Sequence, residues 1–295
     1  MNRKIADRIA TITFVGLSMI IVAILLYLFA YIIMNGFSKI SWDFLTSPSS
    51  NILAGSGIRD QLFNSFYILI LTLIISVPLG VLGGIYMAQY AKPGKLTNFI
   101  RSCIEMLSSL PSIVIGMFGL LVFVNTTGWG YTIFGGALTI AIFNIPVMVR
   151  TCEDAIRSVP RELKEASLAL GITQWHTVKT VLLPSAFPGI LTGVILSAGR
   201  IFGEAAALLY TAGLSTPRLD YTNWNPFADN SPLNIFRPAE TLAVHIWSIN
   251  TQGLIPDVTE KAAGASAVLV ISVLIFNLLA RWIGSMYYKK MTATK

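Results

Sequence analysis

Two charged side chains, Arg200 and Glu204, lie within an otherwise apolar stretch from about Ser185 to Tyr210. A spacing of four residues places both on one face of the helix that this stretch predicts, roughly 24–30 Å from its start at 1.5 Å per residue. A charge inside a membrane helix costs at least ~2.5–3.5 kcal/mol, so it normally faces a cavity or a partner. Because a guanidinium is a planar fork that matches oxyanion oxygens, we predict that Arg200 contacts an anion. Glu204 would hold Arg200 when the site is empty, or accept a proton from a protonated ligand oxygen. A structural lock between helices is the alternative.

The segment from Ser158 to Gly171 predicts a short helix with a defined start and stop. Ser158 is a capping residue, Pro160 is tolerated in a first turn, and Gly171 lies just beyond the end. A second short helix is expected over residues 174–182, with Thr173 as its cap. Two short helices joined at a glycine form a compact knob that suits a groove in a partner protein. An amphipathic helix on the membrane surface is the alternative. One face of the first helix is apolar, with Leu163, Ala166 and Leu170.

The composition is that of a membrane protein: 54% of the 295 residues are hydrophobic, 12% are charged, and soluble domains carry roughly 25% charged residues. The mean hydropathy is +0.69. The net charge of +7 does not indicate nucleic-acid binding, because the basic residues lie at the edges of apolar runs and form no basic groove. Cys103 and Cys152 are too few for a disulfide framework. The sequence has no P-loop, and His176 and His245 lack ligand spacing, so we expect no metal in this chain.

Six apolar segments are long enough to span a bilayer, which takes about 20 residues. The turn residues 125–130 divide one long uncharged run, 106–149, into the third and fourth spans. The other four spans are expected near residues 9–34, 62–90, 185–210 and 262–286. Two long connections, 36–60 and 211–261, separate spans on one side, and the second contains a short apolar helix, 241–250, that would be re-entrant or interfacial.

Three local patterns predict contacts between or within these helices. Gly189 and Gly193, and then Gly199 and Gly203, have the spacing of small residues at close helix packing, either within the subunit or at a subunit interface. Glu105 follows Arg101 by four residues, which favours a local ion pair. Two prolines are expected to break their helices as kinks or hinges, Pro78 and Pro111.

The distribution of basic residues orients the chain. With both termini in the cytoplasm, 15 Lys and Arg side chains lie on the cytoplasmic side and five outside, as the positive-inside rule requires. The expected number of spans is therefore even. The five outside residues are Lys39, Arg59, Arg218, Arg237 and Lys261.

One stretch of the predicted knob carries a family resemblance. Glu165-Ala166-Ser167, three residues, Gly171, nine residues and then Val181-Leu182-Leu183-Pro184 resembles the EAA motif of bacterial ABC importer permeases. The family pattern is E-A-A, three residues, G, nine residues and I-x-L-P, from which this sequence departs at Ser167 and Val181. Further segments between about residues 63 and 282 resemble the PstA-type phosphate permeases: 105–116, 144–151, 199–206 and 244–247.

The resemblance implies an all-α membrane protein with six transmembrane helices and the MetI-like importer permease fold. It implies a bacterial cell-membrane location and three regions: a first helix with its external loop (1–60), a transmembrane domain (61–286) with a coupling loop (150–184), and a cytoplasmic tail (287–295). Inorganic phosphate would pass Arg200 and Glu204. The coupling residues for separate ATPase subunits would be Glu165, Ala166, Ser167, Gly171, Leu183 and Pro184.

The same resemblance implies the partners. These are a homologous second permease subunit of the PstC type, two ATP-binding subunits that hold ATP and Mg²⁺, and an external phosphate-binding protein. The chain itself would be a transport subunit without enzymatic activity. Alternatives at this stage are the same permease class for another oxyanion such as molybdate or sulfate, a channel or secondary transporter that needs no ATPase, and a membrane anchor that only scaffolds partners.

Overall fold

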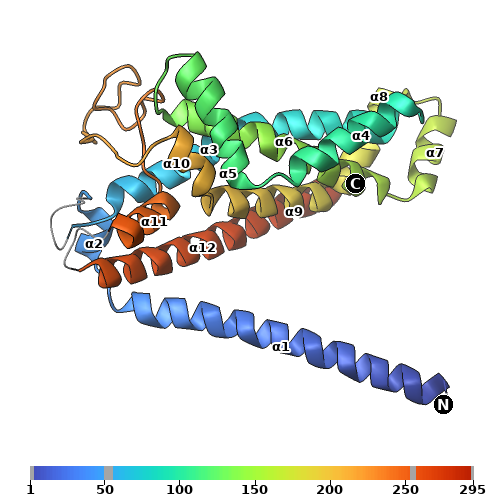
Figure 1. Ribbon diagram of the computed structural model, residues 1–295. Helices are drawn as coiled ribbons and strands as arrows, with labels where there is room; N and C mark the ends of the chain where they lie inside the picture. The colour runs from blue at the N-terminus through green and yellow to red at the C-terminus, as the bar shows by residue number, and fades with distance from the viewer. Residues whose placement is uncertain (1–2, 50–55, 253–256, 294–295) are drawn as a thin grey trace.

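The computed structural model describes residues 3–49, 56–252 and 257–293, and within these ranges the chain forms helices and loops without a strand (Figure 1). Five helical segments are long and apolar enough to cross a membrane. They correspond to α1 (Arg3–Phe37), α3 (Arg59–Ile85) with the π-helical turn η1 (Tyr86–Tyr90), α6 (Ile133–Arg157), the segment that ends in α9 (Leu183–Phe202), and α12 (Val258–Ala293). A bent helix pair raises the number to six if it counts as one span.

The third expected span is a bent helix pair, which confirms the break that was predicted at Pro111. It consists of α4 (Lys95–Ser108) and α5 (Ser112–Gly119) with the π-helical turn η2 (Leu120–Thr126), which meet at an angle of 97°. Pro111 lies at the corner with extended backbone, since proline has no N–H and disfavours helix in the preceding residue. Pro78, which was also expected to break its helix, lies inside an uninterrupted α3.

The centre of the bundle is built by α3, α6 and α9 (Figure 1). Small residues allow the backbones to approach closely, as is common in membrane helices. A Cβ at Gly80 would lie 2.3 Å from Met148 Cβ, and one at Gly84 would lie 2.5 Å from Cys152 Cβ. Gly193 of α9 packs in the same way against Thr151 of α6. For the pair Gly189 and Gly193, the structure therefore places the small-residue contact within the subunit.

The last part of the expected fifth span also differs from prediction. The helix α9 ends at Phe202, and α10 (Ala206–Thr211) begins after a short break that contains Gly203 and Glu204. A hydropathy pattern does not detect this break, because the sequence on both sides is apolar. Arg200 and Glu204 consequently do not share one continuous helix.

The two ends of the bundle differ in structure. One end, here called the hairpin end, carries α7 (Arg161–Ala169) and α8 (Gln174–Thr177), and Figure 1 shows the chain's two termini at the same end. The opposite loop end carries α2 (Trp42–Thr46), α11 (Leu242–Gln252) and the long loop 212–241. The 11-residue α11 is too short to span a bilayer and buries Leu242, Val244 and His245, which agrees with the prediction of a short non-spanning helix.

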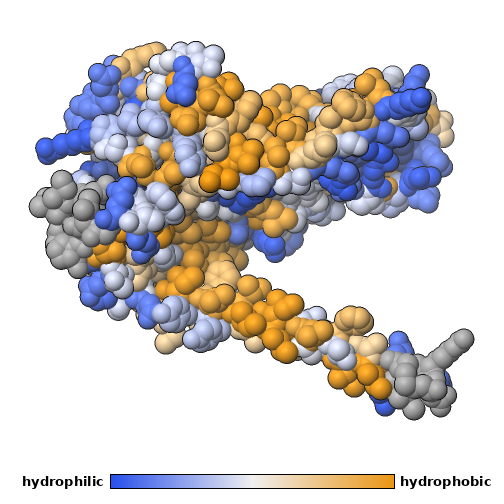
Figure 2. Space-filling view, in the orientation of Figure 1, coloured by the Kyte–Doolittle hydropathy of each residue, from blue (hydrophilic) through white to orange (hydrophobic). Residues whose placement is uncertain are grey.

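The first helix stands apart from the rest of the bundle for most of its length (Figure 1). It meets α12 near the loop end, where Gly36 lies so close to Ala263 and Ala267 that no Cβ would fit. From Ile9 onward most of its apolar side chains are exposed, and Figure 2 shows them as a continuous hydrophobic band. Such a surface requires lipid or another membrane helix around it.

Candidate functional site

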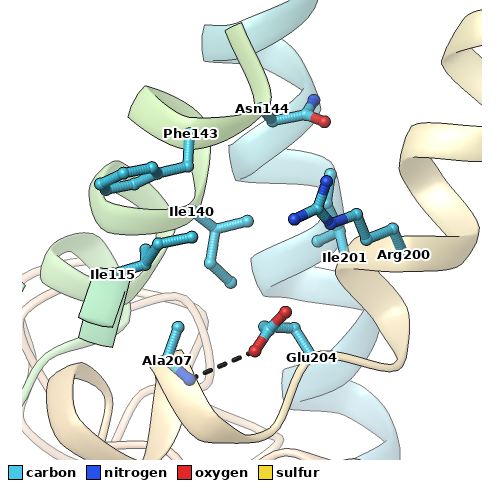
Figure 3. A pocket seen from close by; sticks show the side chains of 8 residues that line it. All are labelled: Ile115, Ile140, Phe143, Asn144, Arg200, Ile201, Glu204 and Ala207. Carbon is cyan, nitrogen blue, oxygen red and sulfur yellow. Dashed lines mark hydrogen bonds between the residues drawn. The ribbon is translucent and has the colours of Figure 1, made fainter. Parts of the chain in front are cut away.

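Arg200 and Glu204 line one pocket, as the sequence predicted, although they come from different local structures (Figure 3). Arg200 projects from the last turn of α9, and Glu204 projects from the break that follows. The opposite wall is apolar and comes from α5 and α6, with Ile115, Ile140 and Phe143. The pocket thus combines one cation and one carboxylate with a water-excluding wall.

The guanidinium of Arg200 is uncommitted. Within the described part of the chain it forms no hydrogen bond or ion pair, and the residue is exposed. The cavity measures only about 20 Å³, which is room for about one water molecule. A tetrahedral oxyanion is larger than water, so a cavity of this size does not enclose one.

Glu204 has a different local role from the one predicted. Its Oε1 accepts a hydrogen bond from the backbone N–H of Ala207 at 3.3 Å, at the start of α10 (Figure 3). This contact satisfies one of the free N–H groups of that helix start. Among the described residues, no ion pair joins Glu204 to Arg200, so the expectation that Glu204 holds Arg200 in the empty site is not met in this conformation.

Asn144 also lines the pocket and was not singled out from the sequence as a site residue. Its Nδ2 donates to Ser76 Oγ of α3 at 2.9 Å, and both residues are buried. The signal in the sequence is a lone amide in an apolar span, which normally faces a partner or a cavity. Asn144 has both kinds of contact, because it donates a hydrogen bond to Ser76 of α3 and also lines the pocket.

The knob predicted over residues 158–182 is present as the α7–α8 hairpin, which projects from the bundle (Figure 1). Gly171 has φ +75°, a conformation that glycine adopts without strain, and Thr173 caps α8 through the backbone N–H of His176. Leu163 and Leu170 are 45% and 80% exposed. The hairpin therefore presents apolar side chains outward, as a docking surface requires.

The residues of the EAA-like motif lie in three different environments: exposed on α7, buried within the hairpin, and at the start of α9. Glu165 and Ala166 are exposed on α7, whereas Ser167 is buried and its hydroxyl lies 2.9 Å from the hydroxyl of buried Thr177. Leu183 and Pro184 open α9, with Pro184 in the first turn, after the π-helical turn η3 (Val178–Leu182). Ser158, which was predicted to cap the first helix, instead ends α6 and donates its hydroxyl to Ala155 O.

A cluster of charged residues lies between α4 and α6 at the hairpin end. Glu105 pairs with Arg150, and Arg101 pairs with Glu153 at 2.7 Å, so the predicted local pair between Arg101 and Glu105 is wrong. Arg157 completes the cluster, with its Nε 2.9 Å from Glu153 Oε1. These partners are 45 and 52 residues apart in sequence, a separation that helical spacing cannot reveal.

At the loop end, buried polar groups fix the loop 212–241 to α3. Arg237 donates to Asn64 Oδ1 at 2.8 Å, and Gln61 Nε2 donates to Glu240 Oε2 at 2.8 Å. Glu240 also lies 3.1 Å from His245 Nδ1. Burial lowers the pKa of Arg237 to about 10, which leaves it charged near neutral pH. Spacing in the sequence does not reveal the bonds from the loop to α3, because Arg237–Asn64 and Glu240–Gln61 are each separated by more than 170 residues.

The fold and sites define a class: a helical, multi-span membrane protein with an exposed docking hairpin and a charged pocket among its spans. Residues 80–293 match the family described as "Binding-protein-dependent transport system inner membrane component". The match covers more than half of the chain, and the chain therefore belongs to this family of ABC importer permeases. It is accordingly an inner-membrane component of a bacterial ABC transporter, a class that works with ATP-binding subunits and a periplasmic binding protein.

Comparison with individual proteins agrees with this assignment. The chain is 70% identical over 293 residues to "Probable ABC transporter permease protein YqgI" of Bacillus subtilis (strain 168), covering 99% of this chain and 100% of that protein. It is 36% identical over 232 residues to "Phosphate transport system permease protein PstA" of Haemophilus influenzae, covering 76% and 80%. A bacterial alginate ABC transporter, solved with an alginate pentasaccharide-bound periplasmic protein, shares the fold at a TM-score of 0.64 and 16% identity, covering 96% and 98%.

Proposed function

We propose that this chain is a permease subunit that imports inorganic phosphate, with Arg200 as a direct contact for the anion in transit. The observation that carries the proposal is the uncommitted guanidinium of Arg200 in a pocket among membrane helices. An unpaired charge there is costly unless a ligand or partner uses it. The resemblance to a phosphate permease at 36% identity supports phosphate among the oxyanions.

The size of the pocket favours a shared site. A cavity of about 20 Å³ with an exposed arginine becomes an anion site when a second surface closes over it. We assign that surface to a homologous second permease subunit of the PstC type. The apolar wall of Ile115, Ile140 and Phe143 would exclude water from the anion and strengthen its attraction to Arg200.

The hairpin would couple transport to ATP hydrolysis in the partner subunits. Two separate ATP-binding subunits, which hold ATP and Mg²⁺, would bind the exposed face of α7 around Glu165 and Ala166, while Ser167, Gly171, Leu183 and Pro184 fix the hairpin to α9. An external phosphate-binding protein would deliver the anion at the loop end. In this proposal the hairpin and both termini face the cytoplasm, and the positive-inside bias supports that orientation.

Uptake of radiolabelled phosphate tests the substrate. Cells that lack this chain and cells with a restored copy are compared, with excess unlabelled phosphate, sulfate or molybdate as competitors. We expect restored uptake that only phosphate blocks and that requires the ATPase subunits. Restoration of sulfate or molybdate uptake instead would overturn the substrate, and uptake that survives deletion of the ATPase would indicate a channel or secondary transporter.

The variant Arg200→Gln tests the site. We expect phosphate uptake to be lost while the variant still assembles with the ATPase subunits, because glutamine removes the charge and the fork but leaves the hairpin unchanged. Arg8→Gln is the matched control, since Arg8 is exposed near the start of α1 and lies outside the pocket and the loop end. Full uptake in Arg200→Gln contradicts the role given to Arg200.

A further inference from the structure

The charged cluster between α4 and α6 surrounds a second, larger pocket. Its cavity volume is about 290 Å³, and three arginines and three carboxylates line it: Arg101, Arg150, Arg157, Glu105, Glu153 and Asp154. A space of this size accommodates an oxyanion together with several waters. The cluster has no net charge, so its affinity for an anion depends on whether one arginine can exchange its carboxylate partner.

The three arginines differ in how firmly they are held. Glu153 has a side chain that is only 11% exposed, and it binds Arg101 at 2.7 Å and Arg157 at 2.9 Å. Arg157 also donates to Met87 O at 3.3 Å. Removing either arginine would leave a nearly buried carboxylate with less compensation, which is unfavourable. These two arginines are therefore structural partners of Glu153.

Arg150 is held only by exposed partners. Its side chain is 54% exposed, and its partners Glu105 and Asp154 are 58% and 68% exposed. Its Nε lies 4.0 Å from Asp154, and its NH1 pairs with Glu105. Exposed ion pairs contribute little net free energy, so a ligand that offers two oxygens to the guanidinium fork can replace Glu105.

The second pocket lies along the same helix as the first. The helix α6 carries Phe143 of the first pocket and then Arg150 and Asp154 of the second pocket. The intervals of seven and four residues place all three on one side of α6. Seven residues correspond to about 10 Å of helix. An anion that leaves Arg200 toward the hairpin end would therefore reach Arg150 next.

We infer that Arg150 forms a second oxyanion site on the transport path, at the hairpin end, in which phosphate replaces Glu105 as the ligand of the guanidinium. The inference rests on the proposed function, because it needs an oxyanion that travels from the Arg200 pocket toward the hairpin end. Arg101 and Arg157 do not contact the anion. Arg101 joins α4 to α6 through Glu153, whereas Arg157 pairs with Glu153 within α6 and donates to Met87 O of η1. Glu105 competes with the anion and thereby limits how long it stays.

Residue-resolved chemical modification tests the site. The complete importer is placed in phosphatidylcholine nanodiscs without ATP, treated with an arginine-specific dicarbonyl reagent, and analysed by mass spectrometry. We expect inorganic phosphate to slow modification of Arg150 severalfold, and sodium chloride at equal ionic strength to have no such effect. Arg101 and Arg157 are internal controls whose modification rates phosphate should leave unchanged.

The outcomes separate the two proposals. Protection of both Arg150 and Arg200 supports the second site. Protection of Arg200 alone overturns the second site and leaves the proposed function standing, whereas protection of neither overturns both. Equal protection by anionic phosphatidylglycerol in the absence of phosphate identifies a lipid-headgroup site and overturns the inference.

Glu105→Gln provides an independent measurement. Because it removes the competing carboxylate, half-maximal protection of Arg150 should need about threefold less phosphate, the scale expected for one exposed ion pair. Asp7→Asn is the matched control, since Asp7 is exposed near the start of α1 and lies outside the pocket and the hairpin. An unchanged or higher phosphate requirement in Glu105→Gln contradicts the exchange of ligands.

Discussion

Two arginines of this chain, Arg237 and Arg200, differ in whether the guanidinium is hydrogen-bonded within the described residues. Arg237 is 3% exposed and donates to Asn64 and to the carbonyl of Pro232, so it holds the loop 212–241 in place. Arg200 has no such partner within the described residues and faces a pocket. The same side-chain type thus holds a loop in place at the loop end and is unpaired, among the described residues, in a pocket between the spans.

At this residue scale, Arg200→Lys separates charge from geometry. Lysine keeps the positive charge but replaces the planar fork with a single ammonium, so we expect phosphate uptake to fall by roughly tenfold and not to vanish as in Arg200→Gln. Initial uptake rates at saturating and limiting phosphate measure the effect. Equal rates for the lysine variant and the natural chain would show that charge alone is sufficient.

The hydroxyl pair of Ser167 and Thr177 gives a second prediction at the residue scale. Ser167→Ala restores the family's E-A-A pattern but leaves the buried Thr177 hydroxyl without its partner, which should cost about 1–3 kcal/mol. Adding Thr177→Val removes the second hydroxyl at nearly the same volume and should recover most of that loss. Thermal unfolding of the two single variants and the double variant measures the coupling, and additive effects would show that the pair contributes nothing.

At the scale of elements, the contact between α9 and α6 depends on the absence of a side chain at Gly193. A Cβ there would lie 2.4 Å from Thr151 Cγ2, so Gly193→Ala should destabilise the bundle by about 1–3 kcal/mol. Gly199→Ala is the matched control, because the nearest neighbour of a Cβ there would be Val273 Cγ1 at 3.9 Å. Thermal unfolding midpoints of both variants test this. Adding Thr151→Ala should restore part of the stability, and no recovery would place the strain elsewhere.

The spans were predictable from the sequence, whereas their breaks were not. The second expected span, 62–90, matches α3 and η1 closely because charged residues and turn residues mark both ends. Pro78 and Pro111 are the same residue type, yet only Pro111 breaks its helix. The residue type alone therefore does not decide whether a helix is broken. The glycines after Pro78 pack closely against α6, whereas Pro111 lies at a corner between two helices. The ion pairs Glu105–Arg150 and Arg101–Glu153 were missed because each joins residues of two different helices, α4 and α6.

At the scale of the whole molecule, the path of the chain determines how many times it crosses the membrane. The termini and the hairpin lie at one end in Figure 1, which requires an even number of crossings. The five continuous spans alone are odd in number. We therefore predict that the bent pair α4–α5 crosses once, starting at the hairpin end and finishing at the loop end with η2.

Accessibility of single thiols tests this path in a chain that carries Cys103→Ser and Cys152→Ser. An impermeant maleimide applied to intact cells should label Asn125→Cys, in the last residues of η2, and Phe227→Cys, whose side chain is 92% exposed in the loop 212–241. Lys95→Cys, at the start of α4, and Leu170→Cys, in the hairpin, should be labelled only after the membrane is permeabilised. Labelling of positions 95 and 125 from the same side would make the bent pair re-entrant. The chain would then cross five times, and both termini could not face the cytoplasm together.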